Sequence, residues 1–200
     1  MPSRDHASPK RPAIFLDRDG VLIENREDYH RSLQEVSVFP QALEALAKAN
    51  QSPYAFVIVT NQSAIGRGLI TPARADAINL RVVAEIEEAG GRIDGVFMCP
   101  HTPEDNCECR KPKPGLILQA ARSLFLNVER SILVGDALSD IEAARLAGIQ
   151  RAALVLTGRG AAQVRLPEAN DLGHFHTFTD LATALEVLLG PDQLMEVPGI

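Results

Sequence analysis

The stretch Ala13-Ile14-Phe15-Leu16-Asp17-Arg18-Asp19-Gly20 joins four apolar residues to two carboxylates and a glycine. A short apolar run that ends at a turn residue is typical of a buried strand in a parallel sheet. Two later runs end in the same way, because Thr60 follows 56–59 and Gly135-Asp136 follows 132–134. Ligands of open parallel sheets lie beyond the carboxyl ends of the strands. We therefore predict that these oxygen-bearing side chains meet at one edge of a sheet.

Composition limits the classes of function. The chain has 200 residues, 46% of them hydrophobic, which is enough for one domain with a sizeable core. No apolar stretch approaches the roughly 20 residues that span a bilayer, and the polar N-terminus lacks the apolar core of a secretory signal. The net charge of −6 argues against a nucleic-acid partner but leaves room for a small phosphorylated substrate. We expect a cytoplasmic protein without membrane or nucleic-acid partners.

Strand and helix signals alternate along the chain. The predicted strands cover 13–16, 55–60, 95–98, 131–135 and 152–156. The predicted helices cover about 41–50, 72–89, 115–125, 138–147 and 179–189. This alternation predicts an α/β fold: a Rossmann-like open parallel sheet of about five strands with helices on both faces. We assign one domain to 12–190, with a disordered tail at 1–11 and a frayed C-terminus at 191–200.

One short segment holds all three cysteines of the chain. Cys99, His101, Cys107 and Cys109 supply three thiols and an imidazole, which suit a closed tetrahedral zinc site, with iron as the alternative metal. A closed site leaves no open position for catalysis, so we expect a structural role. The loop would then fix the backbone that aims the two cations directly after Cys109. The alternative is a loop of free thiols beside a surface histidine.

Four motifs, each at a strand end or a helix start, follow one another along the chain. They are Asp17-Arg18-Asp19-Gly20-Val21, Thr60-Asn61-Gln62, Lys111 within 110–115, and Gly135-Asp136 with Asp140. In order and spacing they resemble the motifs of the haloacid dehalogenase superfamily over 12–160. The resemblance implies a phosphatase, that is, a phosphomonoester hydrolase, that acts through an aspartyl-phosphate.

By this resemblance, the catalytic residues are Asp17, Asp19, Thr60 and Lys111. Asp17 would be the nucleophile, and Asp19 would protonate the leaving oxygen and then take a proton from the attacking water. Thr60 would donate a hydrogen bond to the phosphoryl group. Lys111 would place a positive charge where negative charge accumulates.

The resemblance also implies a magnesium site. Mg²⁺ would be held by Asp17, by the backbone carbonyl of Asp19 and by Asp136, and would neutralise charge on the phosphoryl oxygens. Asp140 lies four residues after Asp136 and would face the same side of a helix. We expect Asp140 to orient Lys111 or a metal-bound water.

The cysteine loop followed by Arg110-Lys111-Pro112 resembles the branch of the superfamily that acts on heptose 1,7-bisphosphate and histidinol phosphate. The substrate contacts implied by that resemblance are Asn25, Asp28, Asn61, Gln62, Ser63 and Arg110. The forked guanidinium of Arg110 suits a second phosphate. The loop 24–30 departs from the branch because it lacks the usual Gly-Tyr-Val element, although Tyr29 is a matching aromatic. In this loop we expect His30 to be solvated.

Superfamily members often carry an inserted cap domain. Here the residues between the motifs are taken up by predicted loops, helices and strands, so we expect a capless, open site. The glycine-rich turn 157–160 lacks a nucleotide-binding pattern, and we expect it to line the rim of the site.

The favoured reaction is removal of the C7 phosphate from a heptose 1,7-bisphosphate, a small phosphorylated sugar used in making cell-surface polysaccharide. Histidinol phosphate is the alternative substrate. Two other functions fit the same residues: a non-catalytic, zinc-stabilised protein that binds phosphorylated metabolites, and a phosphotransferase with an acceptor other than water. The chain has no tryptophan and only 4% aromatic residues, so we expect a monomer.

Overall fold

Six parallel strands form one open sheet in the order β3-β2-β1-β4-β5-β6. The structure, a computed structural model, describes residues 10–190. From edge to edge the strands are β3 (Gly95–Cys99), β2 (Ala55–Asn61), β1 (Arg11–Leu16), β4 (Leu126–Gly135), β5 (Arg151–Val155) and β6 (His176–Phe178). The predicted α/β fold is confirmed, and the sheet has six strands instead of about five because the short β6 adds an edge strand beside β5.

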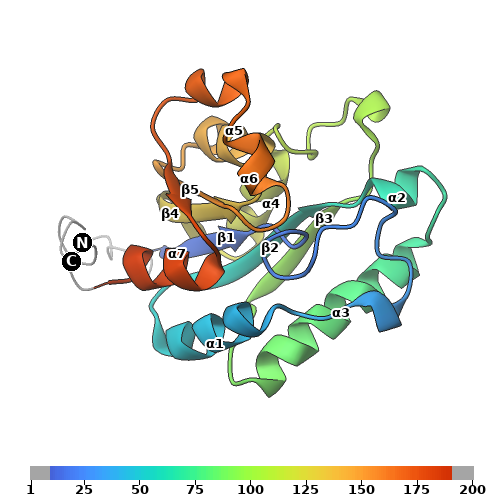
Figure 1. The fold of residues 1–200 in the computed structure, drawn as a ribbon, viewed down its shortest axis with the longest axis horizontal. Coiled ribbons are helices and arrows are strands. Elements are labelled where there is room, and N and C mark those ends of the chain that lie inside the picture. Colours follow the sequence, from blue (N-terminus) through green and yellow to red (C-terminus); the bar gives the residue numbers. More distant parts are fainter. Residues whose placement is uncertain (1–9, 191–200) are drawn as a thin grey trace, which may run out of the picture.

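Helices cover both faces of the sheet (Figure 1). One face packs against α1 (Pro40–Lys48), α3 (Pro72–Glu88) and α7 (Leu181–Leu188), and the other against α4 (Gly115–Ser123) and α5 (Leu138–Ala147). Short helical turns complete the connections: η1 (Leu33–Glu35), η2 (Ala49–Gln51), α2 (Ser63–Gly66), η3 (Pro103–Asp105), α6 (Gly160–Gln163) and η4 (Pro167–Asn170). Within residues 10–190, each helix is too short or too polar to cross a membrane.

The central strand β1 divides its side chains between two apolar cores. Ile14 and Leu16 lie in the core with α1, α3 and α7, whereas Ala13 and Phe15 lie in the core with α4 and α5. All four are fully buried. A shift of one residue along the ladder would send each side chain to the opposite core. The register with β2 and β4 therefore fixes the point at which Asp17 leaves the sheet.

The direction in which strands are added reverses between β1 and β4. In a doubly wound sheet, ligands bind in the crevice at this point. Asp17 follows β1 directly, and its backbone N–H donates a hydrogen bond of 3.0 Å to the carbonyl of Val134 in β4. Asp136 follows β4. The two carboxylates therefore leave neighbouring strands at the same edge of the sheet.

The two connections that could hold a cap are short. Between β1 and β2 the chain contains only η1, α1 and η2, and between β2 and β3 only α2 and α3. Neither connection, all of whose residues the structure describes, contains an inserted domain. The edge of the sheet beyond β1, β2 and β4 is therefore left open, as the motif spacing predicts.

Two strand boundaries differ clearly from those predicted. β1 begins at Arg11, inside the predicted tail. The first nine residues of that tail, and the predicted frayed end at 191–200, lie outside the described residues. β4 begins at Leu126 and not at 131, because the residues that precede Ile132 are largely polar and hide the first half of the strand.

The hidden half of β4 contains a β-bulge. Pro12 pairs with Asn127, but Ile14 pairs with Ile132, so β4 carries extra residues between the two pairs. The buried Ser131 side chain completes the interrupted ladder: its Oγ accepts a hydrogen bond of 2.9 Å from the Ala13 N–H and donates one of 2.5 Å to the Asn127 carbonyl. The Ser131 side chain thus takes the place of a backbone hydrogen-bond partner, shortly before the end of β4 that leads to Asp136.

Removing this side-chain partner should destabilise the sheet. Ser131→Ala should lower the free energy of unfolding by about 1–3 kcal/mol, because the buried N–H of Ala13 loses its acceptor. Urea unfolding checks this, with an unchanged m value indicating a change in stability alone. Ser123→Ala, at an exposed position, is the control and should stay within about 0.5 kcal/mol of wild type. An unchanged midpoint for Ser131→Ala would show that Ala13 finds another acceptor.

Candidate active site

A polar pocket of about 570 Å³ opens at the carboxyl edge of the sheet. Its walls come from the loop after β1, the end of β2, the loop that carries Lys111 and the start of α5. The residues selected from the sequence that line it are Asp17, Asp19, Asn25, Thr60, Asn61, Gln62, Ser63, Arg110, Lys111 and Asp140. Asp136 is fully buried, and its carboxylate lies within 4.8 Å of those of Asp17 and Asp140. The four motifs therefore converge on one place.

The ammonium group of Lys111 lies at the centre of the site. Its Nζ is 2.6 Å from Asp140 Oδ1 and 2.9 Å from Asp17 Oδ1, and it donates a hydrogen bond of 2.8 Å to the Val59 carbonyl. Burial acts to lower the pKa of Lys111, but the charges of Asp140 and Asp17 outweigh it and raise the pKa above its ordinary value. Burial raises the pKa of Asp140 to about 6, although Lys111 opposes this shift. Lys111 therefore carries a fixed positive charge beside Asp17.

Asp136 is held by the turn that follows β5. The backbone N–H and Nε of Arg159 donate to Asp136 Oδ2 at 2.8 and 3.3 Å, and Nη2 donates to Oδ1 at 3.1 Å. Gly20 and Gly158 adopt φ values of 87° and 57° and approach so closely that a Cβ on either would overlap this carboxylate. Burial, followed by the charge of Asp17, raises the pKa of Asp136, and Arg159 opposes the shift.

The carboxylates of Asp17, Asp136 and Asp140 form one acidic cluster, with oxygens within 4.8 Å of one another. Lys111 and Arg159 pair with this cluster but leave it one negative charge in excess. The negative charge of Asp17 contributes to the raised pKa values of the other two. A small divalent cation with oxygen ligands would relieve this repulsion. The residues therefore fit Mg²⁺, with Asp17 and Asp136 as the side chains that would hold it and Asp140 paired to Lys111.

Asp19 belongs to a separate hydrogen-bond network. Nη2 of Arg18 donates to both of its carboxylate oxygens, at 3.1 and 2.9 Å. Nε2 of Gln62 donates to Asp19 Oδ2 at 2.7 Å and lies 2.9 Å from Thr60 Oγ1. Gln62 therefore links Asp19, which is expected to protonate the leaving oxygen, with Thr60, which is expected to bind the phosphoryl group.

Asn61 is bonded to the backbone of Lys111. Its Nδ2 donates to the Lys111 carbonyl and its Oδ1 accepts from the Lys111 N–H, both at 3.1 Å. These two hydrogen bonds position the backbone of Lys111. They also occupy the side-chain amide of Asn61, which the sequence suggests for substrate binding. Arg110 also lines the pocket, and its Nη1 donates a hydrogen bond of 3.1 Å to the His101 carbonyl.

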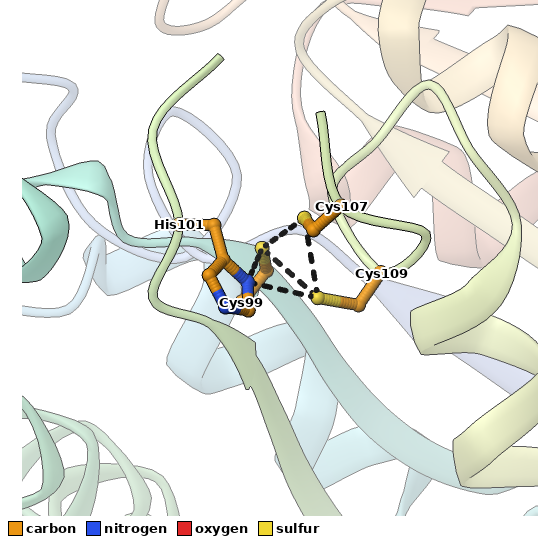
Figure 2. Close-up of side chains that lie close together, drawn as sticks. All are labelled: Cys99, His101, Cys107 and Cys109. Atoms are coloured by element: carbon orange, nitrogen blue, oxygen red, sulfur yellow. Dashed lines mark hydrogen bonds between the residues drawn. The ribbon is translucent and has the colours of Figure 1, made fainter. Parts of the chain in front are cut away.

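Cys99, His101, Cys107 and Cys109 converge in one cluster (Figure 2). The distances between Sγ atoms are 3.6 Å for Cys99 and Cys107, 3.3 Å for Cys99 and Cys109, and 3.5 Å for Cys107 and Cys109. His101 Nδ1 lies 3.6 and 3.3 Å from the sulfurs of Cys99 and Cys109. A tetrahedral site with Zn–S bonds of about 2.3 Å has edges of roughly 3.8 Å. The four side chains therefore fit zinc with little rearrangement.

The cluster combines one deeply buried thiol with a more acidic one. Burial raises the pKa of Cys99 above its ordinary value. At Cys107 burial acts in the same direction, but hydrogen bonds from Cys109 and from the Arg110 backbone outweigh it and lower the pKa to about 7. A thiolate, the form that binds metal, is therefore readily available at Cys107.

His30 is buried, so the expectation that it is solvated is wrong. Its Nε2 lies 2.8 Å from the Glu24 carbonyl and 3.4 Å from Asp19 Oδ1. The charged residues around it in the sequence hide this position, because the loop 24–30 folds back on itself and carries the ring against Asp19. His30 and Asn25 both line the pocket.

The structure does not bring Asp28 to the pocket. Asp28 is exposed and forms two hydrogen bonds of 3.1 Å with Arg26, and Arg26 lines the wall instead. Arg159 is a pocket residue that the sequence does not single out, although the turn 157–160 is expected at the rim. The available signal is the glycine on each side of Arg159, which lets its backbone approach Asp136.

Comparisons with known proteins agree with this geometry. A family model described as HAD-hydrolase-like matches residues 108–184. The chain is similar to the D-glycero-beta-D-manno-heptose-1,7-bisphosphate 7-phosphatases of Pseudomonas aeruginosa (36% identity, covering 90% of this chain and 98% of the relative) and Bordetella bronchiseptica (38%, covering 88% and 97%). The fold is similar to the crystal structure of D,D-heptose 1,7-bisphosphate phosphatase from B. bronchiseptica complexed with magnesium and phosphate. That match has a TM-score of 0.80 at 37% identity and covers 89% of this chain and 98% of the other.

Removing one ligand of the cysteine cluster tests the structural metal. Cys107→Ser should lose bound zinc and lower the unfolding temperature by about 10 °C or more, because metal binding contributes directly to folding at such sites. Metal analysis by mass spectrometry and thermal unfolding check this. Glu104→Gln, at an exposed position of the same loop, is the control and should keep both properties. Full zinc content in Cys107→Ser would contradict the assignment of this residue as a ligand. Iron in the wild-type protein would show that the cluster binds iron and not zinc.

Proposed function

The chain belongs to the haloacid dehalogenase superfamily of phosphatases, and we propose that it removes the C7 phosphate from D-glycero-D-manno-heptose 1,7-bisphosphate with Mg²⁺ as cofactor. The observation that carries this proposal is the placement of Asp17 beside the buried Lys111 at the inner end of the pocket. A carboxylate that attacks a phosphoryl group needs a neighbouring positive charge, because nucleophile and substrate are both anionic. The substrate is supported by relatives that are similar over nearly their whole length.

The reaction proceeds in two steps. Phosphate monoesters are among the slowest bonds to hydrolyse without a catalyst, and a carboxylate nucleophile divides the reaction into two easier steps. An oxygen of Asp17 bonds to phosphorus while the bond to the sugar oxygen breaks and Asp19 gives that oxygen a proton. Asp19 then accepts a proton from water as the water attacks the aspartyl-phosphate, which releases phosphate and restores Asp17.

Charge on the transferred group is stabilised from two sides. The Lys111 ammonium lies against Asp17, and the Thr60 hydroxyl is directed by Gln62 at the end of β2. When bound by Asp17, the backbone carbonyl of Asp19 and Asp136, Mg²⁺ supplies further positive charge at the phosphoryl oxygens. Asp140 keeps Lys111 in place through the contact of 2.6 Å.

Substrate choice falls to the loops, because neither connection between β1 and β3 in the described residues 10–190 holds an inserted cap. A pocket of about 570 Å³ is within the usual range for small-molecule sites and is polar enough for a sugar. Arg110 offers a guanidinium fork suited to a second phosphate. Asn25 and Ser63, which both line the pocket, offer hydrogen-bonding groups for sugar hydroxyls.

Phosphate release should depend on Asp17 and favour the bisphosphate. We expect kcat/KM for heptose 1,7-bisphosphate to exceed that for histidinol phosphate by more than about a hundredfold, or ~2.7 kcal/mol. Asp17→Asn should lower the rate by at least ~10⁴-fold, because the nucleophile is lost. A reversed preference would keep the mechanism and change the substrate. Equal rates for wild type and Asp17→Asn would refute the mechanism, and turnover only with an added acceptor would indicate a phosphotransferase.

Arg110→Ala separates recognition of the second phosphate from catalysis. It should lower kcat/KM for the bisphosphate by about 10–100-fold, because a charge-assisted hydrogen bond of about 1.5–3 kcal/mol is lost. The value for p-nitrophenyl phosphate, which has one phosphate, should change less than about threefold. Arg110→Lys keeps the charge without the fork and should be intermediate. Equal losses on both substrates would mean that Arg110 acts by positioning Lys111.

A further inference from the structure

A polar residue lies on the core-facing side of α3. Asn79 is only 5% exposed, in a helix whose other buried residues are Ala75, Ile78, Val82 and Ile86. Its Oδ1 accepts a hydrogen bond of 2.7 Å from Arg18 Nη1, and its Nδ2 lies 3.6 Å from Met98 Sδ in β3. An amide among apolar residues is costly to bury unless it is hydrogen-bonded. The bond to Arg18 accounts for its presence.

Arg18 connects Asn79 to the active site. Its side chain is 1% exposed. Nη1 of the guanidinium donates to Asn79, and Nη2 donates to both carboxylate oxygens of Asp19. Within residues 10–190, Asp19 is the carboxylate that pairs with Arg18, and Nε of Arg18 has no hydrogen-bond partner. Well-packed apolar side chains often stabilise a protein as well as or better than a buried ion pair. Stability therefore does not by itself account for a buried arginine at this place.

We propose that Asn79 and Arg18 are positioning residues that hold Asp19 in the orientation needed to protonate the leaving oxygen. Asn79 fixes the guanidinium from α3, and the guanidinium fixes the carboxylate, which Gln62 bonds from the β2 side. Without Asn79, Arg18 loses its anchor, and Asp19 loses part of its orientation. The inference rests on the proposed function, in which Asp19 is the general acid, and extends it to a residue on a helix outside the pocket wall.

A general acid that is poorly positioned has a distinctive kinetic effect. A leaving oxygen of high basicity needs a proton as the bond to phosphorus breaks, whereas p-nitrophenolate leaves without one. The ratio kcat/KM covers the steps up to and including transfer of the phosphoryl group to Asp17, so the later attack of water does not enter it. Loss of Asp19 orientation therefore lowers kcat/KM for basic leaving groups and spares p-nitrophenyl phosphate. General damage to the fold lowers both.

The experiment compares three variants with three substrates. Asn79→Leu has a similar volume and no acceptor, Asn79→Asp keeps the acceptor for Arg18, and Val82→Ala alters packing in the same buried face of α3 without touching Arg18. The substrates are heptose 1,7-bisphosphate, phenyl phosphate and p-nitrophenyl phosphate. The two aryl phosphates make the test independent of which sugar the enzyme prefers.

Asn79→Leu should lower kcat/KM for the bisphosphate and for phenyl phosphate by about tenfold or more, part of the 10²–10⁴-fold that general acids contribute. It should change p-nitrophenyl phosphate by less than about threefold. Asn79→Asp should stay within about threefold of wild type on all substrates, and Val82→Ala should leave the ratios between substrates unchanged. Equal losses on all substrates, or no losses, would overturn the proposal.

A second variant covers the case in which Asn79→Leu fails to fold. Arg18→Met removes both guanidinium hydrogen bonds to Asp19, leaves the one from Gln62, and should show the same selective loss on basic leaving groups. If the wild type hydrolyses the aryl phosphates but not the bisphosphate, the proposed substrate is wrong and the positioning role is still decided by the aryl pair. If the wild type releases phosphate from none of the three, the proposed function and this role both fail.

Discussion

The buried ammonium group of Lys111, held between Asp17, Asp140 and the Val59 carbonyl, is the interaction on which the active site depends. A cation with 4% exposure is stable only where opposite charges and acceptors surround it. These partners come from the end of β1, from β2 and from α5, three segments far apart in the sequence. One charge therefore links the three segments, and the same contact orients Asp17, the nucleophile of the proposed mechanism, and gives it a positive neighbour.

Lys111 is itself held from two directions. Asn61 bonds both backbone groups of Lys111 to the end of β2, and the cysteine cluster lies directly before it in the chain. The loop between η3 and α4 has little apolar packing of its own, since Cys107 and Cys109 are among its few residues at the core. A metal with four ligands gives such a loop the rigidity that catalytic positioning requires. Zinc would thus act on the chemistry only through the backbone of Arg110 and Lys111.

Much of this arrangement could be predicted from strand ends. Asp17, Thr60 and Asp136 follow buried apolar runs, and parallel strands bring such positions to one edge. The partners of His30 and Asn79 could not be predicted, because each depends on a contact that local pattern does not encode. The ring of His30 lies against Asp19 only because its loop folds back, and Asn79 meets Arg18 only once α3 packs on the sheet. The start of β4 could not be predicted either, because the residues before Ile132 are largely polar and Ser131 completes the interrupted ladder with its side chain.

An open pocket changes what the body of the protein must do. Here Arg18 and Gln62 donate hydrogen bonds to Asp19 and His30 lies beside it, while Asn79 of α3 holds Arg18 by accepting a hydrogen bond from it. In the proposed mechanism Asp19 gives a proton in the first step and takes one in the second, so its carboxylate has to occupy one place in both steps. Donors fixed before the substrate arrives achieve this without reorganisation during the reaction. On the proposed role, the buried Arg18 lowers the reaction barrier by fixing Asp19, and its presence does not require that it make the fold more stable.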